Sequence, residues 1–345
     1  MAQRKRATIN DIAKSVGVNP STVSRALNPS SKSKISPKVI KKITVAASKL
    51  GYYRNRAAAM LVQKKSYTIG AIIPDLQNPV FPPMIRGLQD VFDKAGYTLI
   101  LSNSENNKDF ADIALSKFQE WAVDGCVLAT ANREDDIIKK CIQNDISLVL
   151  INRTVDDNDV SSVITDDIVG IRSAFNHLVE LGHKNIAHIA GPQDTSTGFE
   201  RYREYISCMK MNDFKDALVE YTDAYNIEEG RLAFQRLWNA EPKVTAIIAG
   251  NDLIALGCID AMHELDLVCP RDVSLVGYND IPFVNRIKPA LTTVSIPKYN
   301  IGVRAAEELL KQLDSPDNKD AKKEVIKLQT ELVVRESTAA PRKSV

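Results

Sequence analysis

Residues 9–28, INDIAKSVGVNPSTVSRALN, predict two short helices joined by a tight turn. Apolar side chains recur at helical spacing on both sides of Gly17, which suits a helix end that needs positive φ. Asn19 can cap the second helix, and Pro20 suits its first turn. The outward positions of that helix are Ser21, Thr22, Ser24 and Arg25. The pair is either an ordinary helical hairpin or a helix-turn-helix, whose second helix reads base edges in a DNA major groove.

The charge of the chain is concentrated in its N-terminal segment, 1–66. This segment holds 15 of the 45 lysines and arginines but one of the 43 acidic residues, Asp11, so the remainder is net acidic. A segment this basic suits a polyanion, because each phosphate that it neutralises releases condensed counterions. A solvated basic face is the ordinary explanation of a charge run. A single acid in so long a segment nevertheless favours double-stranded DNA as a partner.

Length, hydropathy and cysteines limit the class of protein. A chain of 345 residues has room for two or three domains. It begins MAQRKRATI, without the apolar region of a secretory signal, and no apolar run approaches the roughly 18 residues that span a bilayer. The five cysteines lack CxxC spacing, and the histidines lack metal-site spacing. We therefore expect a cytoplasmic, nucleoid-associated protein with no membrane partner, metal or cofactor.

The segment after residue 28 predicts a third helix and then a marginal one. Ser36 and Pro37 suit the start of the third helix, and Gly51 its end. Its apolar positions are Val39, Ile40, Ile43, Val45, Ala46, Ala47 and Leu50. In residues 52–65, YYRNRAAAMLVQKK, the alanine-rich run is too short for a helix that is stable alone. It is either a plain linker or a helix that forms on DNA, where Leu61 would wedge between base steps of the minor groove.

From Thr68 onward, short apolar runs alternate with helical patterns. This alternation predicts parallel α/β sheets, and about ten strands exceed one compact sheet, so we expect two subdomains. The strand-like runs are 69–73, 98–102, 125–129, 147–151, 161–165, 185–190, 245–249, 273–278 and 292–296. The fold class is thus α plus α/β.

Several motifs, in order along essentially the whole chain, resemble the lactose- and purine-repressor (LacI/GalR) family of bacterial transcriptional regulators. They are TINDIAKSVGVNPSTVSRALN, NRAAAML, IGAIIPDLQNPVF, ELGHKNIAHIAGP, GNDLIALG, DVSLVGYNDIP and PALTTVSIP. The resemblance implies a helix-turn-helix headpiece (1–54), a hinge helix and linker (55–66), and a core (67–345) similar to periplasmic binding proteins. In that core, three crossovers near 165–167, 296–297 and 322–328 would join two Rossmann-like subdomains. The N-subdomain would comprise about 67–165 and 297–323, and the C-subdomain about 166–296 and 324–345.

The same resemblance implies which residues contact DNA. Pro20, Ser21 and Arg25 would read bases, with Arg25 suited to a bidentate contact with guanine, whereas Thr22 and Ser24 would meet phosphates. The other implied contacts are Thr8, Asn28, Asn55, Arg56, Ala58 and Leu61. Arg54 stands where relatives often carry proline, which would either loosen the linker or add a phosphate contact.

A cleft between the subdomains would bind a small-molecule effector, which we expect to be a sugar or a related hydroxylated compound. Its implied residues are Asp75, Asn78, Phe81, Asn152, Arg153, Asp166, Thr197, Arg201, Asn251 and Asn279. Arg201 is the strongest candidate, since its planar fork suits hydroxyl pairs or carboxylates. Phe81 would stack on a sugar or belong to the core, and we interpret Asp252 mainly as a helix cap. Asn279 replaces an aspartate that is frequent in sugar-binding relatives, which leaves the effector's identity open.

The function that we predict is a repressor that binds a pseudo-palindromic operator as a homodimer, with a tetramer possible. Effector binding would change the spacing of the hinge helices, and both release and recruitment of DNA occur on this architecture. One alternative is a global regulator controlled by a phosphocarrier protein. An enzyme is disfavoured because GxGxxG after a strand, GxxxxGK[ST] and GxSxG are all missing. A solute receptor would need an export signal.

Overall fold

The computed structural model describes residues 7–27, 35–52, 65–157, 160–214, 216–241, 243–314 and 323–342. The chain divides into two compact units, residues 1–66 and 67–345. The predicted contacts Asn28, Asn55, Arg56, Ala58 and Leu61, together with Arg54, lie outside the described residues.

The first unit is a bundle of α1 (Ile9–Val16), α2 (Pro20–Ala26) and α3 (Pro37–Lys49). Thr8 and Asp11 form a capping box at the start of α1, and Gly17 ends it with φ 72°. Asn19 caps α2 by accepting a hydrogen bond from the Ser21 N–H. The buried core consists of Ile12, Ala13, Val23, Ala26, Ile43 and Ala47.

Two of the apolar positions predicted for α3 are wrong. Val45 and Leu50 are exposed, at 47% and 43% of their surface, because the helix turns only one narrow stripe toward α1 and α2. Ile43 and Ala47, one turn apart, fill that stripe.

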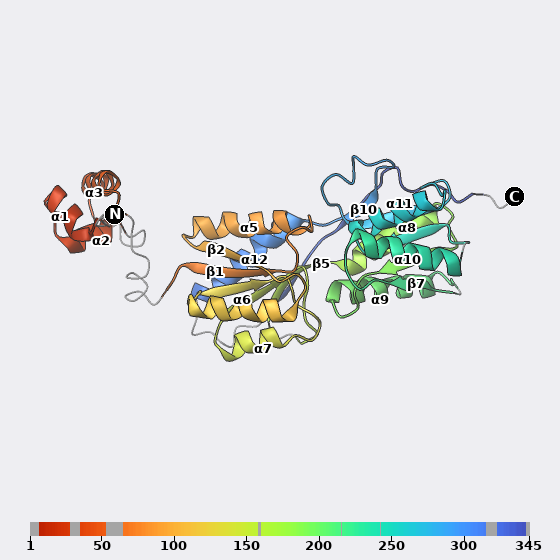
Figure 1. Ribbon diagram of the computed structural model, residues 1–345, viewed down its shortest axis with the longest axis horizontal. Coiled ribbons are helices and arrows are strands. Elements are labelled where there is room, and N and C mark those ends of the chain that lie inside the picture. Colours follow the sequence, from red (N-terminus) through yellow and green to blue (C-terminus); the bar gives the residue numbers. More distant parts are fainter. Residues whose placement is uncertain are drawn as a thin grey trace, which may run out of the picture. The chain divides into compact units, whose positions relative to one another are not determined.

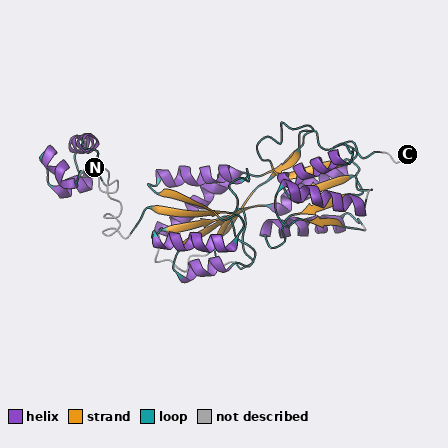
Figure 2. Ribbon diagram, viewed as in Figure 1, coloured by secondary structure: helices purple, strands orange, loops and turns teal. Residues whose placement is uncertain are grey.

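The second unit contains two six-stranded sheets flanked by helices (Figure 1, Figure 2). The first sheet is parallel throughout, in the order β11 (Val325–Leu328), β5 (Ser161–Thr165), β4 (Ser147–Ile151), β3 (Gly125–Leu128), β1 (Thr68–Ile73) and β2 (Thr98–Asn103). One face packs on α5 (Phe81–Lys94) and α12 (Lys298–Asp314), and the other on α6 (Lys108–Glu120) and α7 (Asp136–Gln143).

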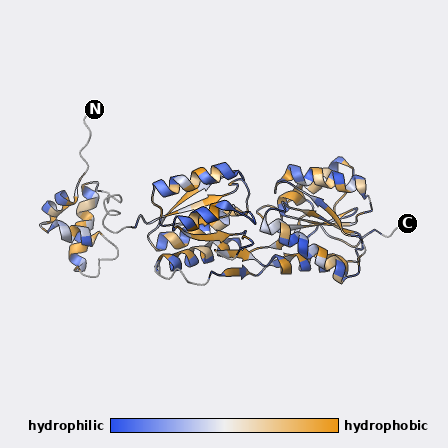
Figure 3. Cartoon of the chain, turned by 90° about the horizontal axis from the view of Figure 1, so that it is seen from below, coloured by the Kyte–Doolittle hydropathy of each residue, from blue (hydrophilic) through white to orange (hydrophobic). Residues whose placement is uncertain are grey.

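The second sheet has the order β12 (Glu331–Val333), β10 (Thr292–Ser295), β9 (Ser274–Asn279), β8 (Ala246–Ala249), β6 (Ile186–Ala190) and β7 (Leu218–Tyr221). It is parallel except at β12, which runs antiparallel to β10. The helices α8 (Asp167–Glu180) and α9 (Ser196–Met211) pack together, as do α10 (Ile227–Ala240) and α11 (Asp252–Glu264). In both sheets the central strands are hydrophobic and buried between helices (Figure 3).

Three crossovers join the two sheets, and the position of the last one differs from the prediction. The first lies at Asp166, between β5 and α8, and the second at residues 296–297, between β10 and α12. The third follows β11, which pairs with β5 of the first sheet, so residues 324–328 belong to the N-subdomain rather than to the C-subdomain. β7, β11 and β12 were not predicted, because each has only three or four residues, one of them charged, and so lacks a long apolar or alternating run.

Candidate functional site

The exposed surface of α2 presents the side chains that were predicted to read bases. Pro20, Ser21, Ser24 and Arg25 are exposed, whereas Thr22 is half-buried. The Nε of Arg25 donates to the Ser21 carbonyl at 3.3 Å, one turn back along the helix. The Thr8 hydroxyl donates to the Asp11 carboxylate at 2.7 Å, so this side chain already has a structural role in the capping box.

The carboxyl ends of strands from both sheets surround a cleft of about 370 Å³. A smaller recess shares Asn78, Phe81, Arg153 and Tyr225 with it, so the two form one continuous site. Parallel α/β sheets bind ligands at this edge, because the loops that follow the strands converge there. The volume suits a ligand of the size of one or two sugar rings.

The structure brings nine of the ten predicted effector residues to this cleft. They are Asp75, Asn78, Phe81, Asn152, Arg153, Thr197, Arg201, Asn251 and Asn279. Phe81 is a core residue, 2% exposed, that also lines the cleft, so the core interpretation is confirmed and stacking on a sugar stays a prediction.

Asp166 is the exception. It does not line the cleft, and its carboxylate accepts a hydrogen bond from the Val169 N–H as the cap of α8. The carboxylate of the adjacent acid, Asp167, forms an ion pair with Arg201, which lines the cleft. The carboxylate of Asp166 is thus engaged as a helix cap, and the structure does not bring this residue to the cleft with the other nine.

Arg201 lies buried deep in the recess, and its charge is neutralised. Its guanidinium pairs with Asp167 at 3.2 Å, donates to the Gly250 carbonyl at 2.8 Å and stacks 3.7 Å from the centre of the Tyr278 ring. The Tyr278 hydroxyl donates to the same Asp167 at 2.7 Å. Burial and this carboxylate raise the pKa of Tyr278, so the phenol stays protonated and holds the arginine plane in place.

Asn279 and Asn251 reach the recess from β9 and from the start of α11. Asn279 has φ 109°, and its backbone carbonyl accepts a hydrogen bond from the Lys298 ammonium at 2.5 Å. Asn251 caps α11 by accepting from the Ile254 N–H, so the cap predicted at Asp252 is wrong by one residue. Asp252 is instead buried, and it accepts hydrogen bonds from the Ile281 N–H and the Thr293 hydroxyl.

Polar atoms without partners concentrate in the cleft. Among the described residues, six buried side-chain atoms lack a hydrogen-bond partner, and five of these belong to cleft residues. The five are Ser104 Oγ, Thr130 Oγ1, Arg153 Nε, Arg201 Nε and Asn279 Oδ1. Buried polar groups are almost always satisfied, so such a cluster is able to bond to a polar ligand that enters the cleft.

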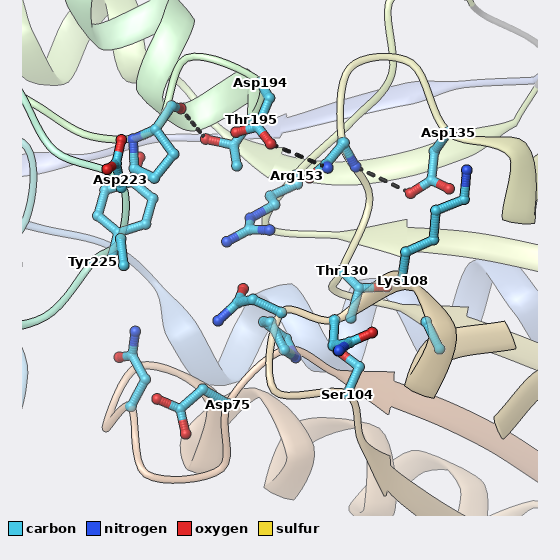
Figure 4. Close-up of a pocket in the computed structure, with 18 of the residues that line it drawn as sticks. Asp75, Ser104, Lys108, Thr130, Asp135, Arg153, Asp194, Thr195, Asp223 and Tyr225 are labelled. Carbon is cyan, nitrogen blue, oxygen red and sulfur yellow. Dashed lines mark hydrogen bonds between the residues drawn. The ribbon is translucent and has the colours of Figure 1, made fainter. Parts of the chain in front are cut away.

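Other cleft residues were missed by the sequence analysis. The Tyr225 hydroxyl is hydrogen-bonded to the Thr197 hydroxyl at 3.0 Å, and Tyr225 follows β7, a strand that was not predicted. Asp194 also lines the cleft, and its carbonyl accepts from the Arg133 N–H at 2.7 Å and its carboxylate from Asn132 at 3.2 Å. These bonds join the loop after β3 to the loop after β6, and Figure 4 draws the one to the Asp194 carboxylate. The sequence signal that could have identified these residues is that they are polar and follow strands, as the predicted cleft residues do.

Within the described ranges, no group of three or more histidine, cysteine or acidic side chains could hold a metal ion. The helices described there are also too short or too polar to cross a membrane.

The sequence is similar to that of known regulators. Residues 8–55 match the family described as bacterial regulatory proteins, lacI family, and residues 175–338 match the periplasmic binding protein-like domain. The ribose operon repressor of Halalkalibacterium halodurans is 32% identical over 96% of this chain and 97% of its own length.

Solved structures with the same architecture include two regulators. The lac repressor dimer bound to operator and an anti-inducer matches with a TM-score of 0.85 at 25% identity, covering 97% of this chain and all of that chain. The complex of the transcriptional regulator CelR with cellobiose matches with a TM-score of 0.72 at 27% identity, covering 96% of this chain and all of that one.

Proposed function

The chain belongs to the lacI family of bacterial regulatory proteins and is a DNA-binding transcriptional regulator. From this premise we propose that its two units have different functions. The first unit reads a pseudo-palindromic operator as part of a homodimer, with α2 in the major groove, and thereby represses transcription. The second unit binds a small hydroxylated effector in its cleft, and this binding changes operator affinity.

The observation that carries the effector half of this proposal is the cluster of unpartnered polar atoms in the cleft. These atoms belong to five residues. Four of the five follow or end strands, and the fifth, Arg201, lies in α9. Hydroxyl groups of a small ligand donate and accept, so one ligand can satisfy donors and acceptors together. Their concentration inside a concave site favours a small molecule over a protein partner as the controlling ligand.

The proposal that the first unit binds DNA is supported by the exposed face of α2 and by the positive charge of this unit. Ser21, Ser24 and Arg25 lie on this exposed face, while Val23 and Ala26 fix the helix on the core. In the lac repressor complex, the similar chain is a dimer bound to operator. A coupling of about 1–3 kcal/mol between the two sites is enough to change operator affinity 5–150-fold.

The variant Arg25→Ala tests the assignment of the reading helix. We expect it to weaken binding to an operator selected from random DNA by about 1–3 kcal/mol, the cost of losing a bidentate base contact. Binding to unrelated DNA should change much less. Lys49→Ala, which removes one positive charge from the exposed face of α3, is the control. Equal losses on operator and unrelated DNA for Arg25→Ala would contradict base reading.

The variant Thr130→Val tests the cleft without breaking an internal bond, because the hydroxyl of Thr130 has no partner. A thermal-shift screen of sugars, nucleosides and purines first identifies a stabilising ligand. Thr130→Val should then leave the stability of the free protein unchanged or higher while weakening that ligand. Thr245→Val, just before β8 and outside the cleft, should show the reverse, since its hydroxyl bonds to His183. Unchanged ligand affinity in Thr130→Val would place the effector elsewhere.

A further inference from the structure

The cleft contains a buried positive charge without a counterion. Arg153 follows β4 and is 7% exposed, and its Nε has no hydrogen-bond partner. Across the described part of the chain, no ion pair or hydrogen bond engages its guanidinium. In Figure 4 the guanidinium projects into the open cleft, with no dashed line reaching it. Arg201, in the same recess, differs because it pairs with Asp167.

The carboxylates of the cleft do not neutralise Arg153. Asp75 accepts from the Gln77 N–H, Asp135 from the Ile137 N–H, and Asp194 from Asn132. The remaining two, Glu134 and Asp223, are exposed at the rim. Asp194 is the cleft carboxylate whose charge acts on Arg153 most, and it does so without an ion pair.

Burial therefore opposes the charge of Arg153. Burial lowers the pKa of its guanidinium, although an arginine remains protonated at neutral pH. A buried cation without a partner is costly for the free protein, and an anion that enters the cleft removes this cost. The arginine fork suits two oxygens of one carboxylate or phosphate. The unpartnered hydroxyls of Thr130 and Ser104 line the same cleft and can donate to a ligand there.

From this arrangement we infer that the effector is an acidic sugar derivative, which places a carboxylate or a phosphate on Arg153. Its hydroxylated body faces Arg201, Asn251 and Asn279 in the recess. The inference rests on the proposed function of the cleft and names the chemical class of its ligand. A neutral sugar would satisfy the hydroxyls and the amides but would leave the positive charge uncompensated.

Matched pairs of ligands test the inference on the full chain. Glucose is compared with glucuronate and glucose 6-phosphate, galactose with galacturonate, and ribose with ribose 5-phosphate, by thermal shift and calorimetry. We expect at least one acidic member to bind at least ten-fold tighter than its neutral parent. Comparing the affinities of the sugar carboxylates with those of the sugar phosphates shows which anion is recognised. A neutral parent that binds as tightly as its acidic derivatives overturns the inference.

Arg153→Met then links the preference to this side chain. The variant should lose the ten-fold preference, because it should weaken the acidic ligand far more than the neutral parent, and its free form should melt at the same or a higher temperature. Arg236→Met, which removes an exposed arginine paired with Glu220, should keep the preference. An equal loss of acidic and neutral ligands in Arg153→Met refutes its role as the anion site.

The two proposals fail differently. If neutral sugars bind and change operator affinity while acidic ones do not, the acidic class is wrong and the proposed effector function stands. If neither class binds the full chain, both are wrong.

Discussion

Asp252 illustrates how neighbouring residues of similar chemistry can exchange roles. Asn and Asp are equally good helix caps, so the sequence Asn251-Asp252 does not reveal which of them starts α11. In the structure Asn251 takes the cap, and Asp252 is fully buried. Burial raises the pKa of Asp252 to about 7, while hydrogen bonds from Thr293 and Ile281 oppose this change. Asp280 adds to the rise and Lys298 reduces it.

This raised pKa gives Asp252 a defined effect on stability. Between about pH 4 and pH 7 the folded protein holds a proton that the unfolded chain has released. The stabilisation is therefore complete below pH 4 and is lost as the pH rises to 7, by at most about 1.4 kcal/mol per pH unit.

Asp252→Asn should remove this dependence. Asp252 accepts from the Ile281 N–H and from the Thr293 hydroxyl, and the oxygen of an asparagine amide can accept both of these bonds. The Tm of the variant minus that of the wild type should increase from pH 5 to pH 8. The difference in Tm between variant and wild type isolates Asp252 from His188. Burial lowers the pKa of His188 to about 4, so His188 makes both proteins more stable as the pH rises. Asp260→Asn, exposed on the same helix, controls for the lost charge. A difference that is constant with pH contradicts the assignment.

At the scale of the elements, two helix pairs pack with their backbones in contact. A Cβ on Gly302 of α12 would overlap the Met84 carbonyl of α5, and one on Gly87 would overlap the Tyr299 carbonyl. Gly230 and Gly257 create the same close approach between α10 and α11. The first pair matters for the site, because α12 follows the second crossover and holds Lys298 against the Asn279 carbonyl.

Gly302→Ala should therefore destabilise the core. In a free helix surface this substitution stabilises by about 1 kcal/mol, but here overpacking should cost about 1–3 kcal/mol. The urea midpoint reports the sign of the net change. Arg304→Ala, on the exposed face of α12, should stay within about 0.5 kcal/mol of the wild type. A stabilised Gly302→Ala protein would show that the two helices separate easily.

The elements that sequence could predict are those whose local pattern is strong. The nine apolar strands and the three headpiece helices follow from hydrophobic runs and caps such as Asn19. β11 could not be predicted, because Val325 and Lys327 are exposed on an edge strand whose partner, β5, is distant in the sequence. The glycine contacts between helices were invisible for the same reason, since they depend on tertiary packing.

The candidate site was predictable to the extent that it lies at strand ends. Asn152, Arg153 and Asn279 follow or end predicted strands, and the structure gathers them. The missing counterion of Arg153 could not be read from the sequence, because it depends on where five carboxylates point. Tyr225 was missed together with its strand, β7.

At the scale of the whole molecule, charge separates the two units. The first unit, 1–66, holds 15 lysines and arginines and a single acid, whereas the rest of the chain is net acidic. Attraction to phosphate backbones therefore resides in the first unit, and the second contributes mainly a ligand-dependent free energy. Residues 53–64, which connect the two, lie outside the described residues, so how that free energy is transmitted stays a prediction from the sequence.

Leu61→Ala tests this connection. If two copies of the segment enter the minor groove in a dimer, the Leu61 side chains unstack a base step and bend the operator. Removing them should decrease the bend angle, measured by energy transfer between dyes at the DNA ends, and weaken specific binding. Effector affinity, measured without DNA, should remain that of the wild type, because the cleft belongs to the other unit. A variant that bends the operator as strongly as the wild type would exclude Leu61 as a wedge, and the segment would then be a plain linker whose length alone couples effector to operator.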